Sequence, residues 1–417
     1  MATRPGEKQV VAQGVDALAP ELVLLARRIH EHPELSFQEH EAVKCLTEPL
    51  ARRGFSVKTG VAGLETAFEA SWTGSPGGPQ IAFLAEYDAL PELGHACGHN
   101  LIGAAAVGAA LALREACPDL RATIAVVGTP AEEDGGGKII MCDHEVFDKF
   151  DAAMLCHPRH RTEVLRGGLA CVDVTYGFHG RSAHAASAPE QGVSALEALI
   201  TAFVAINAAR QFLPARSLIH GIITHGGTAP NVVPAFAEAK FILRARDVKE
   251  LFDLRRRVDA ITAGAAAAFG ATCTSQSGLV YAERLNNVEL AGVFRRNLES
   301  IGVQVHDPEP DGGLGSSDIG NVGHRTATIH PYIAIGRAMT HTREFAEAAA
   351  SDDGMAGMLQ AAKALALTAF DLATDSALLQ RVRAEFAEAV QGASHMENSR
   401  IASAGAGGDP LVRPRPN

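Results

Sequence analysis

The stretch QIAFLAEYD, residues 80–88, decides the fold. Its first six residues form a short apolar run typical of a strand buried on both faces, and the polar residues Glu86 and Asp88 follow at once. Two later runs, 122–128 and 152–156, repeat this plan, and helix-like segments separate the three runs. The pattern predicts an α/β fold with an open, mostly parallel sheet.

Polar side chains follow each of these runs. Glu132 and Glu133 come after the second run, and His157 comes directly after the third. In open α/β sheets, ligands bind outside the carboxyl ends of the strands. We therefore expect these side chains to share one crevice with Glu86 and Asp88.

Between residues 170 and 281 the order of the elements changes. The pattern predicts strands and helices in the order βαββαβ, with strands at 171–176, 217–224 and 237–246, a helix at 193–211, and then a further helix and strand. This order is the ferredoxin-like arrangement, which forms a compact unit by itself.

The α/β pattern resumes near Arg284, with a strand at 332–335. We therefore predict a discontinuous domain of residues 1–169 and 284–391, into which a second domain, residues 170–283, is inserted. Residues 392–417 contain Gly, Ser and Pro without periodicity, and we expect them to form a mobile tail.

Composition limits the classes of function. With 417 residues, the chain exceeds the size that one hydrophobic core usually supports, so two domains are expected. The formal net charge of -11, with both signs interspersed, argues against a nucleic acid or an anionic membrane as partner. The most apolar stretch, 101–113, is too short to cross a bilayer, and the N-terminus shows no apolar signal segment. We expect a cytoplasmic protein.

Residues 94–100 read GHACGHN and contain candidate metal ligands. Cys97 and His99 lie just before a predicted buried helix, and thiolate and imidazole groups suit zinc and related metals. The alternative is a buried cysteine beside histidines that cap the helix, which is the more common role of such residues. The spacing by itself leaves both interpretations open.

Residues 129–137 read TPAEEDGGG and place three carboxylates side by side after a strand. Their mutual repulsion is relieved either by a cation or by wide solvation. In the first case one carboxylate binds the metal while its neighbour takes a proton from water. In the second the segment is an exposed acidic turn. The glycines lack the spacing of a phosphate-binding loop, so we interpret them as turn formers.

Histidines near the other strand ends complete the candidates. His157 is a candidate ligand because it follows the third run directly, whereas His160 is expected on the surface. His341 follows a predicted strand and loop, and by itself it indicates no more than a polar residue with a partner.

Seven motifs, in order along nearly the whole chain, resemble those of the metallopeptidase family that contains aminoacylase, carboxypeptidase G and bacterial dipeptidases. They are most similar to its amidohydrolase branch, which includes indoleacetyl-amino-acid and aminobenzoyl-glutamate hydrolases. The motifs are HPELSFQE (32–39), DALP (88–91), HACGHN (95–100), GTPAEEDGGGK (128–138), HGRSAHAA (179–186), GGTAPNVVP (226–234) and THTREF (340–345).

This resemblance implies a site with two divalent metal ions, for which Zn²⁺ or Mn²⁺ is expected. Carried over position by position, it implies five ligands: Cys97, His99, Glu133, His157 and His341. Mixed sulfur, nitrogen and oxygen ligands suit several transition metals, so the identity of the metal stays open.

The resemblance also implies roles beyond the ligands. Glu132 would be the general base, and Asp88 would orient a ligand histidine by fixing its tautomer. The inserted domain would serve as lid and dimerisation domain, from which His184 would reach the active site of the neighbouring subunit and stabilise an oxyanion. Asn231 and Arg244 would bind the substrate, with the guanidinium holding a carboxylate.

Two positions depart from the family pattern. Asn100 stands where many members have aspartate, and Glu86 stands where they usually have aspartate or histidine. Both departures resemble the dipeptidase-like and aminobenzoyl-glutamate-like members, and they leave the substrate open.

These features predict a metal-dependent amidohydrolase that cleaves the amide bond of an N-acyl or N-aroyl amino acid or of a dipeptide. We expect a small substrate with a carboxylate, and a homodimer formed through the inserted domain. Three alternatives remain: hydrolytic deamination of an aromatic amine at the same metals, a thiol hydrolase with Cys97 as nucleophile, and a binding protein without catalytic activity.

Overall fold

The computed structural model describes residues 5–308 and 314–401. Contacts divide the chain into two units. The first comprises the residues up to Gly167 together with Arg284–Gly392, and the second comprises Gly168–Glu283.

The first unit is built around a sheet with the strand order β1-β2-β4-β3-β5-β11. Its strands are β1 (Ser56–Thr59), β2 (Phe68–Thr73), β3 (Gln80–Ala85), β4 (Thr123–Gly128), β5 (Ala152–Met154) and β11 (Ala327–Ile329). Strand β3 pairs in parallel with β4 and β5, and β11 pairs in parallel with β5, whereas β2 is antiparallel to both β1 and β4. The predicted α/β fold with a mostly parallel sheet is confirmed, and the three predicted runs form its centre.

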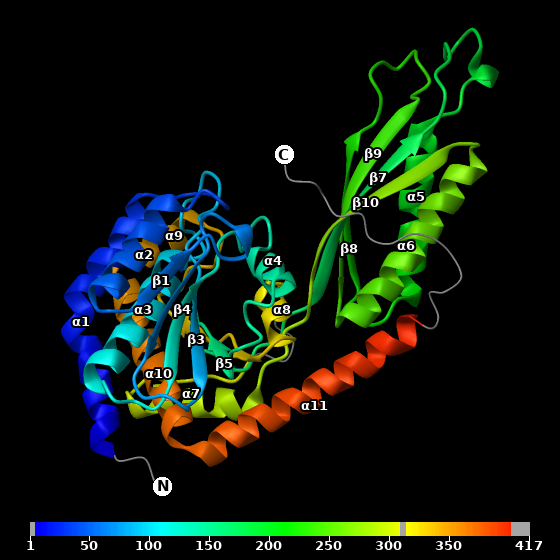
Figure 1. Ribbon diagram of the computed structural model, residues 1–417. Helices are drawn as coiled ribbons and strands as arrows, with labels where there is room; N and C mark the ends of the chain where they lie inside the picture. The colour runs from blue at the N-terminus through cyan, green and yellow to red at the C-terminus, as the bar shows by residue number, and fades with distance from the viewer. Residues whose placement is uncertain (1–4, 309–313, 402–417) are drawn as a thin grey trace. The chain divides into compact units, whose positions relative to one another are not determined.

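Helices cover both faces of this sheet (Figure 1). One side carries α1 (Pro5–Glu31), α2 (His40–Arg52), α3 (His99–Ala116), α7 (Val288–Ser300) and α10 (Asp352–Thr374), and the other carries α4 (Gly137–Asp143) and α8 (Ile319–Gly323). Ile81 and Phe83 of β3 join the core on the α3 side, while Ala82 and Leu84 join the core on the α4 side. Because both faces are buried, the strand is apolar at every position rather than at alternate ones.

A small second sheet in this unit pairs β6 (His157–Arg159) in parallel with β12 (Tyr332–Ala334). The strand predicted at 332–335 therefore exists, but it lies beside His157 and outside the main sheet. Helix α9 (Arg343–Ala350) follows it.

Helix α1 is the one helix among the described residues that is long and apolar enough to cross a membrane by length and composition. One face of it, including Val11, Val15, Leu22 and Ile29, is buried in the core of the first unit. The core helix of a soluble protein passes the same test, so this finding is weak evidence for a membrane span. The cytoplasmic location and the lack of a membrane partner stay predictions.

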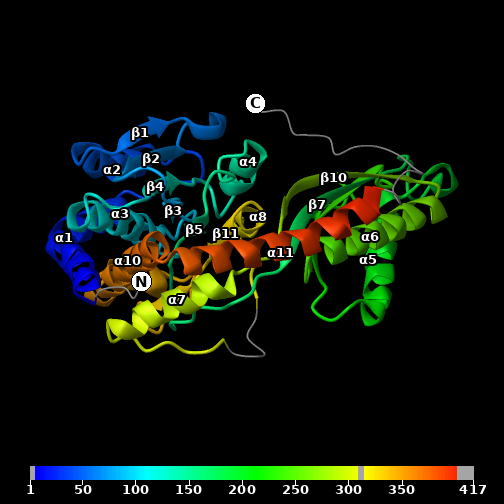
Figure 2. The same cartoon turned by 60° about the horizontal axis from the view of Figure 1, so that its bottom comes forward.

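The second unit has the predicted element order βαββαβ. Its elements are β7 (Ala170–His179), α5 (Ala195–Ala209), β8 (Leu218–His225), β9 (Phe236–Ala245), α6 (Val248–Ala268) and β10 (Thr272–Tyr281). The antiparallel sheet has the order β10-β7-β9-β8, and α5 and α6 pack on one of its faces (Figure 2). Burial alternates along β9, with Ala237, Ala239, Phe241 and Leu243 in the core, as expected for a sheet covered on one side.

Helix α11 (Ser376–Ile401) continues into the segment for which we expected no regular structure. The rest of the expected mobile tail, residues 402–417, lies outside the described residues.

Candidate functional site

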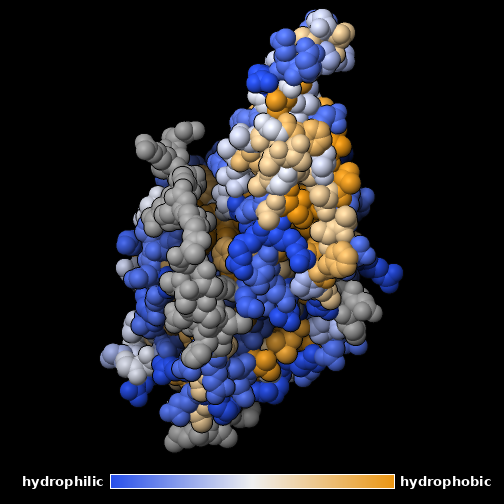
Figure 3. Space-filling model, turned by 90° about the vertical axis from the view of Figure 1, so that its right-hand side faces the viewer, coloured by the Kyte–Doolittle hydropathy of each residue, from blue (hydrophilic) through white to orange (hydrophobic). Residues whose placement is uncertain are grey.

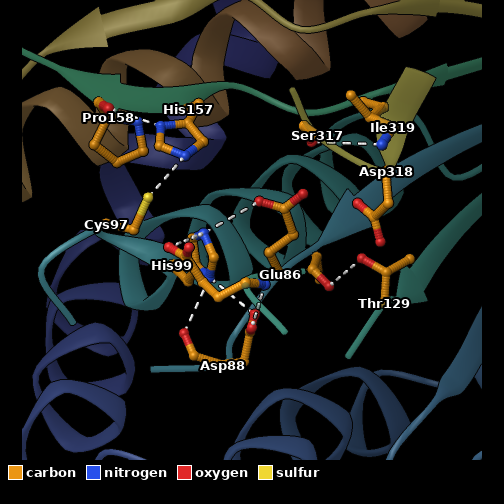
Figure 4. A network of polar contacts seen from close by, with 12 residues as sticks. Glu86, Asp88, Cys97, His99, Thr129, His157, Pro158, Ser317, Asp318 and Ile319 are labelled. Carbon is orange, nitrogen blue, oxygen red and sulfur yellow. Dashed lines mark hydrogen bonds and ion pairs between the residues drawn. The ribbon is translucent and has the colours of Figure 1, made fainter. Parts of the chain in front are cut away.

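The carboxyl ends of β3 and β4, the start of α3 and the start of β6 bring polar side chains together in the first unit. Figure 4 shows Cys97, His99 and His157 beside Asp88 and Glu86. These residues are buried, with His99 and Glu86 fully inaccessible. The crevice predicted from the strand ends therefore exists.

The five predicted ligands converge from segments that are distant in the sequence. The Sγ atom of Cys97 lies 3.4 Å from Nε2 of His157 and 3.6 Å from Nε2 of His341. Oε1 of Glu133 lies 3.4 Å from Nε2 of His341 and 4.0 Å from Nε2 of His99. Ligand atoms of these residues thus surround a small common volume.

These donors fit divalent metal ions. Nε2 of His99 and Oε1 of Glu133 are buried and have no hydrogen-bond partner among the described residues. Groups of side chains whose ligand atoms all lie within 4.8 Å of one another are Cys97–His99–His157, Cys97–Glu133–His341 and His99–Glu132–Glu133. A buried polar atom without a partner is costly, and a cation among these thiol, imidazole and carboxylate groups removes that cost.

Asp88 orients two of the ligands at once. Its Oδ1 accepts a hydrogen bond from Nδ1 of His99 at 2.9 Å, and its Oδ2 accepts one from the backbone N–H of Glu133 at 2.9 Å. Burial raises the pKa of Asp88, but the charge and hydrogen bond of His99 and the N–H of Glu133 outweigh burial and lower it to about 2. The arrangement leaves Nε2 of His99 directed toward the other ligands.

His157 is oriented by the backbone. Its Nδ1 donates to the carbonyl oxygen of Pro158 at 2.7 Å, so Nε2 is left as the acceptor that faces Cys97. The ring stacks on His330 at 5.3 Å between centroids, and Arg284 donates to Nδ1 of His330 at 3.2 Å. His330 and Arg284 are residues that the sequence did not single out, since neither follows a predicted strand at the crevice.

Glu132 lies beside the ligand group without being confined to it. Its carboxylate falls within 4.8 Å of ligand atoms of His99 and Glu133, and also of Glu86 and Asp318. Burial raises the pKa of Glu132 well above its usual range, and the negative charges of Glu86, Asp318 and Glu133 raise it further. A carboxylate that holds a proton this readily suits proton transfer.

Two residues at the site have a left-handed backbone although they are not glycine. Ala131, just before Glu132, has φ +58°, and its N–H donates to Oε1 of the buried Glu39 at 2.9 Å. His341 has φ +65°, and its N–H donates to the carbonyl oxygen of Ala96 at 2.8 Å. Strain of this kind is typical of functional sites, and these hydrogen bonds hold it in place.

The remaining predicted site residues lie in the second unit. Nδ1 of His184 accepts hydrogen bonds from the N–H groups of Ala186 and Ser187 at 3.2 Å, and the N–H of Ala185 donates to the carbonyl oxygen of Asn231 at 3.0 Å. His184 and Asn231 therefore occupy paired loop segments.

Arg244 lies elsewhere in the second unit, near the carboxyl end of β9, whereas Asn231 precedes that strand. Because a strand rises about 3.3 Å per residue, the strand puts Arg244 some 20 Å or more beyond Asn231. Within one subunit the two predicted substrate-binding residues are thus not brought together.

The structure gives Asn100 a reason to be an amide. Its Nδ2 donates to the carbonyl oxygens of Ala26 in α1 at 3.2 Å and of Ala349 in α9 at 3.1 Å, and the side chain is fully buried. Asn100 thereby joins α3 to two other helices. A carboxylate has no N–H to offer these two acceptors.

We therefore expect Asn100→Asp to lower the free energy of unfolding by at least about 3 kcal/mol, because it buries a charge against two carbonyl oxygens. Urea denaturation measures the change. Asn207→Asp, at an exposed position of α5, is the control and should be close to neutral. An Asn100→Asp protein as stable as the parent would contradict this account of the side chain.

Comparison with known proteins shows similarity along both units. A family model described as a peptidase dimerisation domain matches residues 164–268. The chain is 39% identical over 397 residues to Xaa-Arg dipeptidase of Mus musculus, covering 91% of this chain and 92% of that protein. It is 30% identical over 439 residues to a p-aminobenzoyl-glutamate hydrolase of Escherichia coli, covering 87% and 91%.

Solved structures share the fold. A dinuclear metal-binding peptidase of the M20 family from Bacillus subtilis superimposes with a TM-score of 0.68 at 21% identity, covering 85% of this chain and 99% of that one. A putative aminohydrolase from methicillin-resistant Staphylococcus aureus gives a TM-score of 0.76 at 20% identity, covering 88% and 99%.

Proposed function

Because the chain belongs to peptidase family M20, we propose that it hydrolyses the amide bond of a dipeptide or an N-acylated amino acid at a site for two divalent metal ions. The chain is a metal-dependent hydrolase of C–N bonds. The observation that carries the proposal is the convergence of five ligand side chains around buried atoms that have no protein partner among the described residues.

The ligands would be the five residues predicted from the sequence: Cys97, His99, Glu133, His157 and His341. When bound, the two cations would lower the pKa of a water molecule and polarise the carbonyl of the scissile amide. Zn²⁺ and Mn²⁺ are the metals we propose, since this mixture of sulfur, nitrogen and oxygen donors suits borderline transition metals.

Glu132 would move the proton that hydrolysis requires. Its carboxylate would accept a proton from the attacking water and pass it to the nitrogen of the leaving amine, so that the C–N bond breaks with a neutral leaving group. Its place beside His99 and Glu133, together with its environment of Glu86 and Asp318, supports this role. Asp88 would hold His99 and Glu133 in position throughout.

For the substrate, we propose a dipeptide with a basic carboxyl-terminal residue as the first candidate. The support is the 39% identity to a protein named Xaa-Arg dipeptidase, over 91% of this chain. The match to an aminobenzoyl-glutamate hydrolase makes an N-aroyl glutamate the competing candidate. Release of free amino acid from both kinds of compound, compared as kcat/KM, separates the two.

We also propose a homodimer formed through the second unit. Large apolar side chains are exposed on β8, at the edge of its sheet, and on α5: Leu218, Ile222, Ile223, Ile200 and Val204. Apolar residues also gather on the surface seen in Figure 3. An exposed edge strand with apolar neighbours suits pairing with a second copy of the chain. In such a dimer His184 would serve the active site of the other subunit.

Removal of the metals tests the proposed function. We expect dialysis against a chelator to abolish release of amino acid from a dipeptide, and added Zn²⁺ or Mn²⁺ to restore it, because the residues named above do not ionise water unaided. Elemental analysis before and after dialysis should follow the same course. Activity that survives complete loss of metal would favour the alternative in which Cys97 is the nucleophile.

A further inference from the structure

Lys138 is a buried lysine to which the proposed mechanism gives no role. Its side chain is fully inaccessible, and its Nζ lies 2.7 Å from Oε1 of Glu86 and 2.7 Å from Oδ1 of Asp318. Its backbone N–H donates to Oδ2 of the same Asp318 at 3.0 Å. Lysine is almost never fully buried unless it is paired, so the two carboxylates explain how it is tolerated.

The lysine is the cation of an acidic cluster. The carboxylates of Glu86, Glu132 and Asp318 have oxygen atoms within 4.8 Å of one another. Burial lowers the pKa of Lys138, but the charges of Asp318, Glu86 and Glu132 outweigh burial and raise it above its usual range. The side chain is therefore an ammonium ion with fixed partners, Glu86 on one side and Asp318 on the other.

The second oxygen of Glu86 faces the candidate metal centre. Its Oε2 lies 3.6 Å from Nε2 of His99, which is closer than Oε1 of the proposed ligand Glu133 at 4.0 Å. Figure 4 shows Glu86 between His99 and Asp318. Distance from His99 thus does not separate Glu86 from a ligand. The feature that separates them is the ammonium group on the other oxygen of Glu86, since no ammonium is paired with Glu133 among the contacts of the described residues.

We propose that Lys138 is a positioning residue that holds Glu86 outside the metal ligand set; this inference rests on the two-metal site of the proposed function. The pair of bonds from Asp318 fixes Lys138, and Lys138 fixes the Glu86 carboxylate through Oε1. A Glu86 side chain released from Lys138 turns Oε2 toward His99 and competes for a position that hydrolysis needs. Lys138 acts through Glu86 and does not touch the substrate.

The first test replaces the ammonium by an apolar group of similar length, in Lys138→Met. We expect kcat to fall roughly 10- to 100-fold with KM changed by less than about threefold, as is typical when a residue that orients metal ligands is lost. In the cobalt-substituted protein the visible absorption should weaken, because an added oxygen ligand raises the coordination number.

The double variant Lys138→Met/Glu86→Gln decides between positioning and a merely structural role. It removes one positive and one negative charge, and it removes the carboxylate that would enter the ligand set. We expect it to regain at least about tenfold in kcat over Lys138→Met, within the range by which such residues affect activity, and to recover the cobalt spectrum of the parent protein. A double variant no better than Lys138→Met overturns the proposal.

Two further variants complete the experiment. Glu86→Gln alone should keep both metals by elemental analysis and keep the parent cobalt spectrum, and loss of metal would overturn the proposal by making Glu86 a ligand. This variant still decides the question if Lys138→Met does not fold. Lys149→Met, which removes an exposed lysine paired with Glu69 at 2.7 Å, is the matched control and should change neither kcat nor the spectrum. A failure of the proposed function would appear instead in the parent protein, as absence of bound metal and of amide hydrolysis.

Discussion

Glu132→Gln should lower kcat by roughly 10²- to 10⁴-fold while the protein keeps its metal ions, because general acid–base catalysis contributes that much. The substitution preserves the size of the side chain and removes its ability to accept and return a proton. Glu132 is not required to complete the five-ligand set around Cys97, His99 and His341, so metal content should stay unchanged. The measurements are steady-state hydrolysis of a dipeptide and elemental analysis of the same samples.

The control for this experiment is Asp134→Asn. Asp134 belongs to the same acidic turn but is exposed, so its replacement should leave kcat within about twofold of the parent, as for a surface position away from the reacting groups. A Glu132→Gln protein with near-normal kcat would remove Glu132 from the base role. Loss of metal from that protein would move Glu132 into the ligand set instead.

Asp88→Asn should weaken metal binding by roughly 10- to 100-fold, the range found when residues that orient metal ligands are replaced. Both oxygens of Asp88 accept hydrogen bonds, one from Nδ1 of His99 and one from the N–H of Glu133. An asparagine offers one oxygen and one NH₂ group, so one of these donors must face another donor. The side chain of His99 and the backbone at Glu133 then lose their fixed directions together. Competition with a chelator of known affinity measures the change.

Asp151→Asn is the matched control. Asp151 lies at the opposite end of β3, where its Oδ2 accepts from the N–H of Gln80 at 2.8 Å. This substitution disturbs the same strand without reaching the metal ligands, so metal affinity should equal that of the parent. If Asp88→Asn binds metal as tightly as Asp151→Asn does, Asp88 has no orienting role.

The fold was predictable where the signal is local. Strands β3, β4 and β5 were predicted because burial on both faces makes them apolar throughout, and the order βαββαβ followed from the change of period after residue 170. The short strand β6 and its pairing with β12 were not predicted, since three residues carry too little pattern.

The site was predictable in part. Cys97, His99, Glu133 and His157 were candidates by position, because carboxyl ends of parallel strands meet at one edge of a sheet. His341 was chosen through the resemblance to a family, since 244 residues separate it from Cys97 and its local sequence indicates nothing. The catalytic and binding roles given to all of these residues stay predictions until the variants are measured.

Asn100 and Glu86 were recognised from the sequence as departures, but their meaning was not. The amide of Asn100 is explained by two carbonyl oxygens on α1 and α9, at sequence separations of 74 and 249 residues. Glu86 is explained by Lys138, a residue that the sequence presented only as the end of a glycine-rich motif.

The sequence by itself determined which segments are buried strands, which side chains stand at their ends, and which family motifs the chain carries, because each of these is written in neighbouring residues. The tertiary structure decided which of those side chains meet. Lys138 and Asp318 are 180 residues apart, and no local pattern predicts that they bind each other or that they leave Glu86 one oxygen beside His99. Buried charges are stable only with partners, and the partners are set by which surfaces of the fold come together.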